Sequence, residues 1–178
     1  EHVCIRDAPS VLEYEGVKIA IENNVNVSVI SPIKGAFNAH VIRSNAELDL
    51  CLLKPSRVFA NPISIAKQDL KIGDRVYAIA APLGISGENL ALIFDGYFSG
   101  TNRGRTFYTL PTRPGSSGAA VLNNRYEVVG VIYAAFMRIE NVGIGTGRDA
   151  LEDFLFTPVS VEVKKPSILL GPIMLEPA

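Results

Sequence analysis

Short runs of apolar and β-branched residues, separated by turn-forming residues, recur along most of this 178-residue chain. Residues 25–30 (VNVSVI) alternate with period two, whereas 49–54 (DLCLLK) and 75–80 (RVYAIA) are compact apolar runs. The same pattern predicts further strands over residues 37–43, 90–98, 105–110, 119–122 and 127–136, with a hairpin turn at 123–125. Many short strands with almost no helix between them indicate an all-β domain, either an antiparallel barrel or a sandwich.

The end of the chain has a different pattern. Residues 149–156 (DALEDFLF) place Leu151, Phe154 and Leu155 on one stripe, which predicts a short helix. Residues 157–163 then alternate like an exposed strand, and a proline-interrupted apolar tail follows. We expect residues 157–178 to form a C-terminal extension that docks on a partner protein or a second copy of the chain by strand addition. A self-packed or disordered terminus is the competing interpretation.

Composition narrows the classes of function. The chain carries 17 Lys and Arg against 18 Asp and Glu, so it has no strong field to attract nucleic acid or an anionic membrane. No apolar run approaches about 20 residues, so we expect no membrane span. Two histidines and two cysteines without metal-ligand spacing predict no metal site, and we expect no cofactor. The start without a signal peptide or an initiator Met suggests a processed or trimmed product.

The segment PGSSGA at residues 114–119 suggests a nucleophile, Ser117. A serine hydroxyl needs a general base that a third group orients, and the tetrahedral intermediate needs hydrogen-bond donors aimed at its oxyanion. Pro114 and Gly115 permit a tight loop whose N–H groups converge, and Gly118 leaves space beside the serine. By itself the segment is equally compatible with an ordinary turn of small residues.

Other segments, in the same order along the chain, resemble the trypsin-like peptidases, most closely the bacterial HtrA/Deg-like branch. Residues 45–54 (NAELDLCLLK) are similar to that family's Asp-Leu-Ala-Leu-Leu strand, and 73–84 (GDRVYAIAAPLG) to its next strand and turn. PGSSGAAVLN followed by VVGV at 128–131 is similar to the nucleophile loop and the strand after it. Residues 143–147 (GIGTG) stand where the family has a glycine-rich strand beside the specificity pocket.

This resemblance covers about residues 25–156 and implies a fold. We expect two antiparallel β-barrels of chymotrypsin type, at about residues 1–70 and 71–145, and then a short C-terminal helix. Together they form a peptidase domain over residues 1–156. The two strands that precede the catalytic histidine in the family are absent from the sequence, so the first barrel is expected to lack its opening strands.

The resemblance also implies a catalytic triad. The family's base lies in a Thr-x-x-His-Val motif, and only EHVC at the start of this chain fits, which makes His2 the base. Asp49 then orients it, Ser117 is the nucleophile, and the backbone N–H groups of Gly115 and Ser117 form the oxyanion hole. A frayed terminal histidine and a strand-edge charge are the competing interpretations of His2 and Asp49. His40 is a rival base that we interpret as an outward-facing strand histidine.

The family's layout assigns the substrate-binding positions to residues before the nucleophile and on two later strands. They are Pro111, Thr112, Tyr133, Ala134, Ala135, Gly143 and Gly145. None is acidic, so an arginine or lysine of the substrate would find no ion-pair partner. We expect a small or medium apolar residue before the scissile bond, although Tyr133 is equally compatible with a buried structural aromatic.

Cys4 and Cys51 each follow a proposed triad member by two residues. They become neighbours, and able to form a disulfide, if His2 and Asp49 meet; buried free thiols are the preferred interpretation. GIGTG before a helix superficially matches a dinucleotide-binding motif, but no βαβ unit follows, so we reject that function.

The sequence therefore predicts a serine endopeptidase that acts on polypeptide substrates through an acyl-enzyme. A protease-fold scaffold without strong activity, such as a virion component, is the main alternative, because a fold does not dictate a function. An esterase with the same triad is the third interpretation. A secreted, periplasmic or virion-associated location is compatible with each.

Overall fold

The computed structural model describes residues 11–14, 17–20, 27–31, 35–57, 61–87, 89–136 and 139–157. In chain order the elements are β1 (Val11–Tyr14), β2 (Val17–Ala20), β3 (Val27–Ser31), β4 (Gly35–Asn45), β5 (Leu50–Pro55), β6 (Arg75–Ala80), the 3-10 turn η1 (Pro82–Gly84), β7 (Leu92–Asn102), β8 (Arg105–Tyr108), β9 (Ala120–Leu122), β10 (Val128–Ala135), β11 (Gly143–Gly147) and the helix α1 (Arg148–Phe156). The predicted all-β class with one late helix is confirmed.

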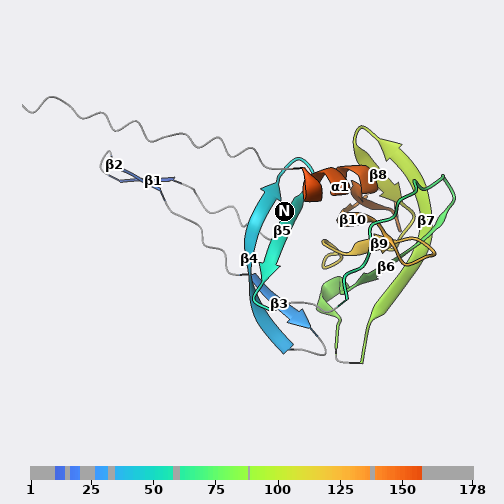
Figure 1. Cartoon of the computed structure of the whole chain (residues 1–178), viewed down its shortest axis with the longest axis horizontal. Coiled ribbons are helices and arrows are strands. Elements are labelled where there is room, and N and C mark those ends of the chain that lie inside the picture. Colours follow the sequence, from blue (N-terminus) through green and yellow to red (C-terminus); the bar gives the residue numbers. More distant parts are fainter. Residues whose placement is uncertain are drawn as a thin grey trace, which may run out of the picture.

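Six strands close into an antiparallel barrel in the order β10-β11-β8-β7-β6-β9, with β9 pairing back to β10 (Figure 1). Alternate residues of these strands point inward, as period two requires. Val76, Tyr108 and Val121 are 0% exposed and form part of the cluster that fills the barrel. Closure pairs every strand on both sides, which removes the exposed edges of an open sheet.

Tyr108 explains why the apolar strand β10 contains a glycine. A Cβ at Gly130 would lie 2.4 Å from the Tyr108 Oη and 2.5 Å from the carbonyl oxygen of Thr146. Burial raises the pKa of the Tyr108 hydroxyl, which donates a hydrogen bond to the carbonyl oxygen of Val129 at 3.4 Å. The VVGV segment therefore needs its glycine so that a large aromatic ring can occupy the barrel interior.

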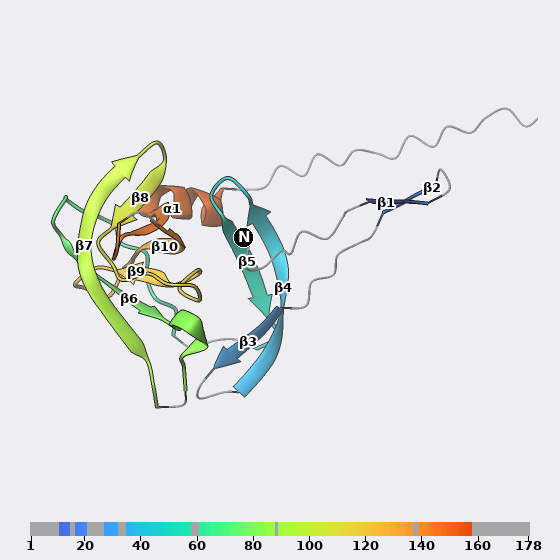
Figure 2. The same ribbon diagram turned by 180° about the vertical axis from the view of Figure 1, so that it is seen from behind.

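β3, β4 and β5 form a second antiparallel sheet, which lies beside the barrel in both views (Figures 1 and 2). Phe37 and Ala39 of β4 are buried on one face of it, and alternate residues are exposed. In the part of the chain that the structure describes, this first unit is an open three-stranded sheet and not a closed barrel. The architecture agrees with the chymotrypsin-type fold that was expected, with an incomplete first barrel.

The helix α1 connects the two units (Figure 1). Leu151 and Phe154 on its apolar stripe pack against Leu50 of β5, and Val128 and Val131 of β10 join the same cluster. Contacts at the end of the helix add to this packing: the Arg43 guanidinium donates to the Phe154 carbonyl oxygen and lies 5.7 Å from the ring centroid. The helix therefore fixes the sheet relative to the barrel.

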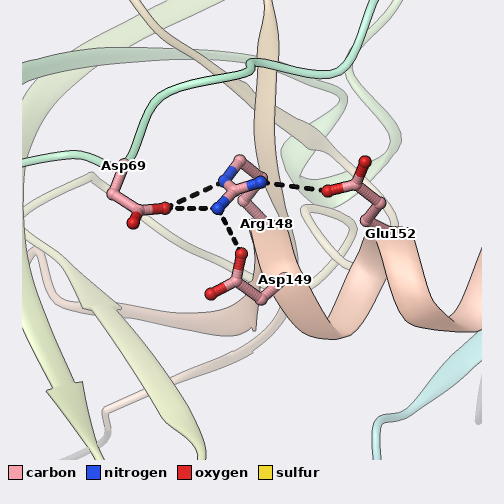
Figure 3. A network of polar contacts seen from close by, with 4 residues as sticks. All are labelled: Asp69, Arg148, Asp149 and Glu152. Atoms are coloured by element: carbon pink, nitrogen blue, oxygen red, sulfur yellow. Dashed lines mark hydrogen bonds and ion pairs between the residues drawn. The ribbon is translucent and has the colours of Figure 1, made fainter.

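Arg148, the first residue of α1, joins the helix to the segment that leads into β6 (Figure 3). Its Nε and one terminal nitrogen donate to Asp69 Oδ1 at 3.0 and 2.5 Å, and its other terminal nitrogen donates to Glu152 at 3.0 Å. Asp149 completes the network as an ion pair. Because these carboxylates are largely exposed, each pair contributes only about 0–1 kcal/mol, and the network serves mainly to orient the segment.

Most predicted strands occur within a few residues of their expected bounds, and β6 has the bounds that the sequence predicts. Asp49 differs, because it ends the turn before β5 instead of lying in the strand. The hairpin of β1 and β2, in which Val11 pairs with Ala20, was not predicted. The extension proposed for residues 157–178 lies outside the described residues, apart from Thr157.

The packing of α1 can be tested with two phenylalanines of the same helix. Phe154 is 8% exposed and Phe156 is 70% exposed. We expect Phe154→Ala to lower the free energy of unfolding by about 3–5 kcal/mol, because it leaves a cavity between the helix and β5. Phe156→Ala is expected to change it by less than about 0.5 kcal/mol. Urea denaturation followed by circular dichroism measures both, and equal losses would contradict this packing.

Candidate active site

The loop that carries Ser117 connects β8 to β9 and is shaped by two glycines. Gly115 and Gly118 have φ of 95° and 88°, in the region that favours glycine. A Cβ at Gly115 would lie 2.6 Å from the carbonyl oxygen of Ala81, and the Leu83 N–H donates to the Pro114 carbonyl oxygen at 2.7 Å. The loop is thus held directly against η1, and the PLG turn and the PGSSG loop form one unit.

The two adjacent serines have different environments. Ser116 is 3% exposed, and its Oγ accepts a hydrogen bond from the backbone N–H of Arg113 at 3.3 Å. Ser117 is half-buried, and its Oγ donates to the carbonyl oxygen of Tyr133 at 3.1 Å. Ser116 therefore supports the loop, whereas the hydroxyl of Ser117 lies at the surface of the barrel.

Tyr133 occupies an irregularity in the pairing of β10 with β11. Ile132 pairs with Gly145 and Ala134 pairs with Ile144, so Tyr133 has no partner on β11. Bulges of this kind bend a strand locally and turn a residue toward a new neighbour, and they are common beside active sites. Here the bulged residue supplies the carbonyl oxygen that accepts the Ser117 hydroxyl.

The backbone N–H groups of the loop divide into two sets. Those of Ser116, Gly118 and Ala119 donate to the carbonyl oxygens of Arg113, Ile132 and Ser116, at 2.9, 2.8 and 3.1 Å. Within the described residues, the N–H groups of Gly115 and Ser117 donate to no protein acceptor. These are the two N–H groups that the sequence predicts for the oxyanion hole, and both are available to an oxygen outside the protein.

Asp49 lies at the junction between the first sheet and the barrel. It is half-buried and has φ of 53°, a conformation that aspartate adopts more readily than most residues. In the turn before it, the Leu48 N–H donates to Asn45 Oδ1 at 3.0 Å, and the Leu48 carbonyl oxygen accepts from Thr146 Oγ1 of β11 at 2.6 Å. Leu50, on its other side, packs against α1. Asp49 is therefore fixed to the barrel on both sides.

The hydroxyl of Tyr133 has a raised pKa. Burial raises it, the positive charge of Arg105 opposes this effect, and the negative charge of Asp49 adds to it. The backbone carbonyl oxygen of the same residue accepts the Ser117 hydroxyl.

The structure describes only one of the two candidate bases. His40 is exposed on β4, opposite Lys54 of β5, which confirms that it is an outward-facing strand histidine. His2 lies outside the described residues, so its role as the base stays a prediction.

The expectation of a free thiol is wrong for Cys51. Cys51 lies on β5, is half-buried and is disulfide-bonded. Free cysteines are usually well buried, and that general tendency supported the original expectation. At this half-buried position the thiol is instead oxidised.

Several predicted substrate-binding residues lie together beside the bulge. A Cβ at Gly143 would lie 2.5 Å from Thr112 Oγ1, and Gly143 pairs with Ala135. Ala134 is the next residue toward Tyr133, and Pro111, like Ala135, is half-buried. These predicted residues are uncharged, and the larger side chain of Ile132 also lies here, with its Cδ1 3.2 Å from where a Cβ of Gly143 would be.

Gly145 is buried, as are Thr112 and Gly143. A Cβ there would lie 2.4 Å from the Val131 carbonyl oxygen and 3.3 Å from Tyr108 Cε2. This glycine is required where β11 crosses the Tyr108 ring, and its contact with substrate stays a prediction.

A second hollow in the protein lies away from the serine loop. A cavity of about 310 Å³ lies beside the start of α1, between Leu70, Phe98, Tyr108 and Arg148. It contains none of the predicted site residues. Among the residues whose placement is described, no group of three or more His, Cys, Asp or Glu side chains could hold a metal ion. In the same part of the chain, no helix has the length and apolar character needed to cross a bilayer.

Comparisons with known proteins identify the family and the fold. A family model described as a trypsin-like peptidase domain matches residues 4–131. No curated protein matches the sequence. A serine endoprotease from Yersinia pestis has a similar structure, with a TM-score of 0.67 at 22% identity, over 76% of this chain and 49% of that one.

Two structures of Rv3671c from M. tuberculosis are also similar to this chain. The inactive form of a serine-to-alanine mutant has a TM-score of 0.62 at 18% identity, over 75% of this chain and 73% of that one. The active form of the Rv3671c protease has a TM-score of 0.62 at 18% identity, over 73% of this chain and 62% of that one. The chain thus spans only part of these proteins, about half of the Yersinia pestis one, and at such identities the likeness concerns the fold.

The fit of the serine loop against η1 can be tested with alanine at each glycine. Gly118→Ala meets no atom within 4 Å, so it should cost only the strain of its positive φ, about 1–2 kcal/mol. Gly115→Ala also meets the Ala81 carbonyl oxygen, and we expect a loss of roughly 3–4 kcal/mol. Urea denaturation compares the two variants. If Gly115→Ala is no worse than Gly118→Ala, the loop does not lie against η1 in this way.

Proposed function

Because the chain belongs to the family of trypsin-like peptidase domains, we propose that it hydrolyses peptide bonds through an acyl-enzyme formed on Ser117. The observation that supports this most directly is the set of hydrogen-bonding groups that the serine loop exposes. It combines a half-buried hydroxyl at the barrel surface with two N–H groups that have no acceptor among the described residues. Acyl transfer requires a nucleophilic hydroxyl and, beside it, hydrogen-bond donors for the oxyanion that develops.

In the proposed mechanism, His2 accepts the proton of the Ser117 hydroxyl while Oγ attacks the carbonyl carbon of the scissile bond. The hydroxyl must rotate away from the Tyr133 carbonyl oxygen to reach the base. The N–H groups of Gly115 and Ser117 bind the oxyanion that develops. The protonated imidazole then gives its proton to the leaving amine, and water releases the acyl group by the same steps in reverse order.

Asp49 has a positioning role in this mechanism. Its carboxylate accepts the imidazole N–H of His2, which fixes the tautomer and stabilises the charged imidazole. The anchoring of the turn through Leu48 and Thr146 supports this role, because orientation requires a carboxylate that does not move relative to Ser117.

A fluorophosphonate probe tests the nucleophile. We expect covalent labelling of the native protein and of Ser116→Ala, and none of Ser117→Ala, with the adduct located by mass spectrometry. Ser116→Ala is a matched control because it removes a neighbouring hydroxyl that the mechanism does not use. Absence of a Ser117-dependent adduct from folded protein would contradict the enzyme and favour a protease-fold scaffold.

Asp49→Asn tests the orienting carboxylate. Asparagine also tolerates a positive φ, so the turn is preserved while the charge is lost. We expect the labelling rate to fall by about 10³–10⁴-fold, as for loss of an orienting aspartate in a serine peptidase. An unchanged rate in a variant with a native circular dichroism spectrum would assign Asp49 a structural role only.

Substrate preference tests the proposed pocket. Thr112, Ala134 and Gly143 provide no negative charge, so we expect peptides with Ala, Val or Leu before the scissile bond to be cleaved best. Their kcat/KM should exceed that of Arg or Lys peptides by at least about 10-fold, since a charged side chain would be desolvated without a partner. Preference for Arg or Lys would contradict the assignment, and cleavage of esters but not peptides would identify an esterase.

A further inference from the structure

The two cysteines of the chain are spaced identically from two of the proposed catalytic residues. Cys4 follows His2 by two positions, and Cys51 follows Asp49 by two positions. A covalent link between the cysteines would therefore bring together the two short segments that carry the imidazole and the carboxylate.

Cys51 is in a position to make such a link. It is disulfide-bonded, and it pairs with Ser44 of β4 as the second residue of β5. Leu50 and Leu52, on either side of it, belong to the cluster that packs against α1, so the Cys51 side chain lies on the other face of the strand. Among the described strands, β5 pairs only with β4, which leaves its second edge available to another segment of the chain.

We propose that the partner of Cys51 is Cys4 of the same chain, and that this disulfide holds His2 against Asp49 and makes the peptidase redox-dependent. The inference rests on the proposed function, in which His2 is the base. Cys51 is two positions from Asp49 and Cys4 is two positions from His2, so the link joins the chain close to both catalytic residues. Because bonded cysteines have Cβ atoms only about 4 Å apart, the link limits how far His2 can move away.

Reduction reverses this arrangement. A dithiol reductant gives two electrons and two protons to the disulfide, so that the S–S bond breaks, both cysteines become thiols and the reductant becomes a disulfide. The segment that carries His2 is then held beside β5 by non-covalent contacts alone, and the closure of the long loop between the cysteines is lost. The fraction of molecules with the base in place decreases, while Asp49 and Ser117 keep their anchoring within the described fold.

Peptide mapping tests the connectivity. Proteolysis of the unreduced protein, followed by mass spectrometry, should give a cross-linked pair of peptides that contain Cys4 and Cys51. The pair should disappear after reduction. A link between Cys51 residues of two chains, or a free Cys4 thiol in the native protein, would overturn the proposal.

Kinetics test the switch. We expect the rate of fluorophosphonate labelling at Ser117 to fall at least about 10-fold on reduction and to recover on reoxidation. Cys51→Ser and Cys4→Ser should be equally slow and insensitive to the reductant. With a peptide substrate, kcat should fall more than KM rises.

The outcomes separate the two proposals. Equal labelling in both redox states would overturn the switch and leave the proposed function standing. No labelling in either state would overturn the proposed function, and this inference with it. Circular dichroism of the reduced protein is the control. Loss of the β-sheet spectrum at the assay temperature would show that the disulfide supports the whole fold, which also overturns a specific effect on the base.

Discussion

The packing of α1 against β5 is the interaction on which the geometry of the candidate site depends. Asp49 lies in the turn between β4 and β5 of the first sheet and Ser117 in a loop of the barrel, and these are separate units of the fold. Phe154 and Leu151 join them through one apolar cluster with Leu50. Catalytic groups must be held to within about 0.5 Å, a tolerance that a buried cluster beside Asp49 can provide and exposed ion pairs cannot.

The serine loop is a second rigid unit that depends on glycine. Gly115 meets η1 at a distance that no side chain would permit, and Gly118 gives the chain its turn toward β9. Between Arg113 and Ala119 the other backbone N–H groups have internal acceptors, so that in this stretch only those of Gly115 and Ser117 are left for a ligand within the described residues. Unused donors gathered at one place are typical of a functional loop, since a purely structural turn would satisfy them.

Much of the fold could be predicted from the sequence because apolar and polar residues alternate clearly in the strands. The strand β6 and the helix α1 stand between clear turn and glycine signals, and both occur where they were expected. The hairpin of β1 and β2 has a weaker signal, since VKIA alternates but VLEY begins with two adjacent apolar residues, and it was not predicted. Local pattern was therefore sufficient only where the alternation is clear.

The site could be predicted only in part. Ser117 was proposed from the glycines of its loop and Asp49 from the resemblance of its segment to the family's strand, and their catalytic roles stay predictions. The role of the Tyr133 carbonyl depends on a bulge in the pairing of β10 and β11, and register shifts of this kind have no reliable local signal. The oxidation of Cys51 depends on a contact far away in sequence, so the general tendency of cysteines to be buried thiols was misleading.

The central claim is that Ser117, with Asp49 and His2, forms one acyl-transfer site. The most direct measurement is a crystal structure of the oxidised protein after reaction with a fluorophosphonate. We predict a phosphonyl group on Ser117 Oγ, with one oxygen about 2.7–3.1 Å from the N–H nitrogens of Gly115 and Ser117. The His2 imidazole should lie within hydrogen-bonding distance of both Asp49 and the adduct. An adduct on another residue, or an Asp49 carboxylate bonded elsewhere while His2 lies away from Ser117, would contradict this account.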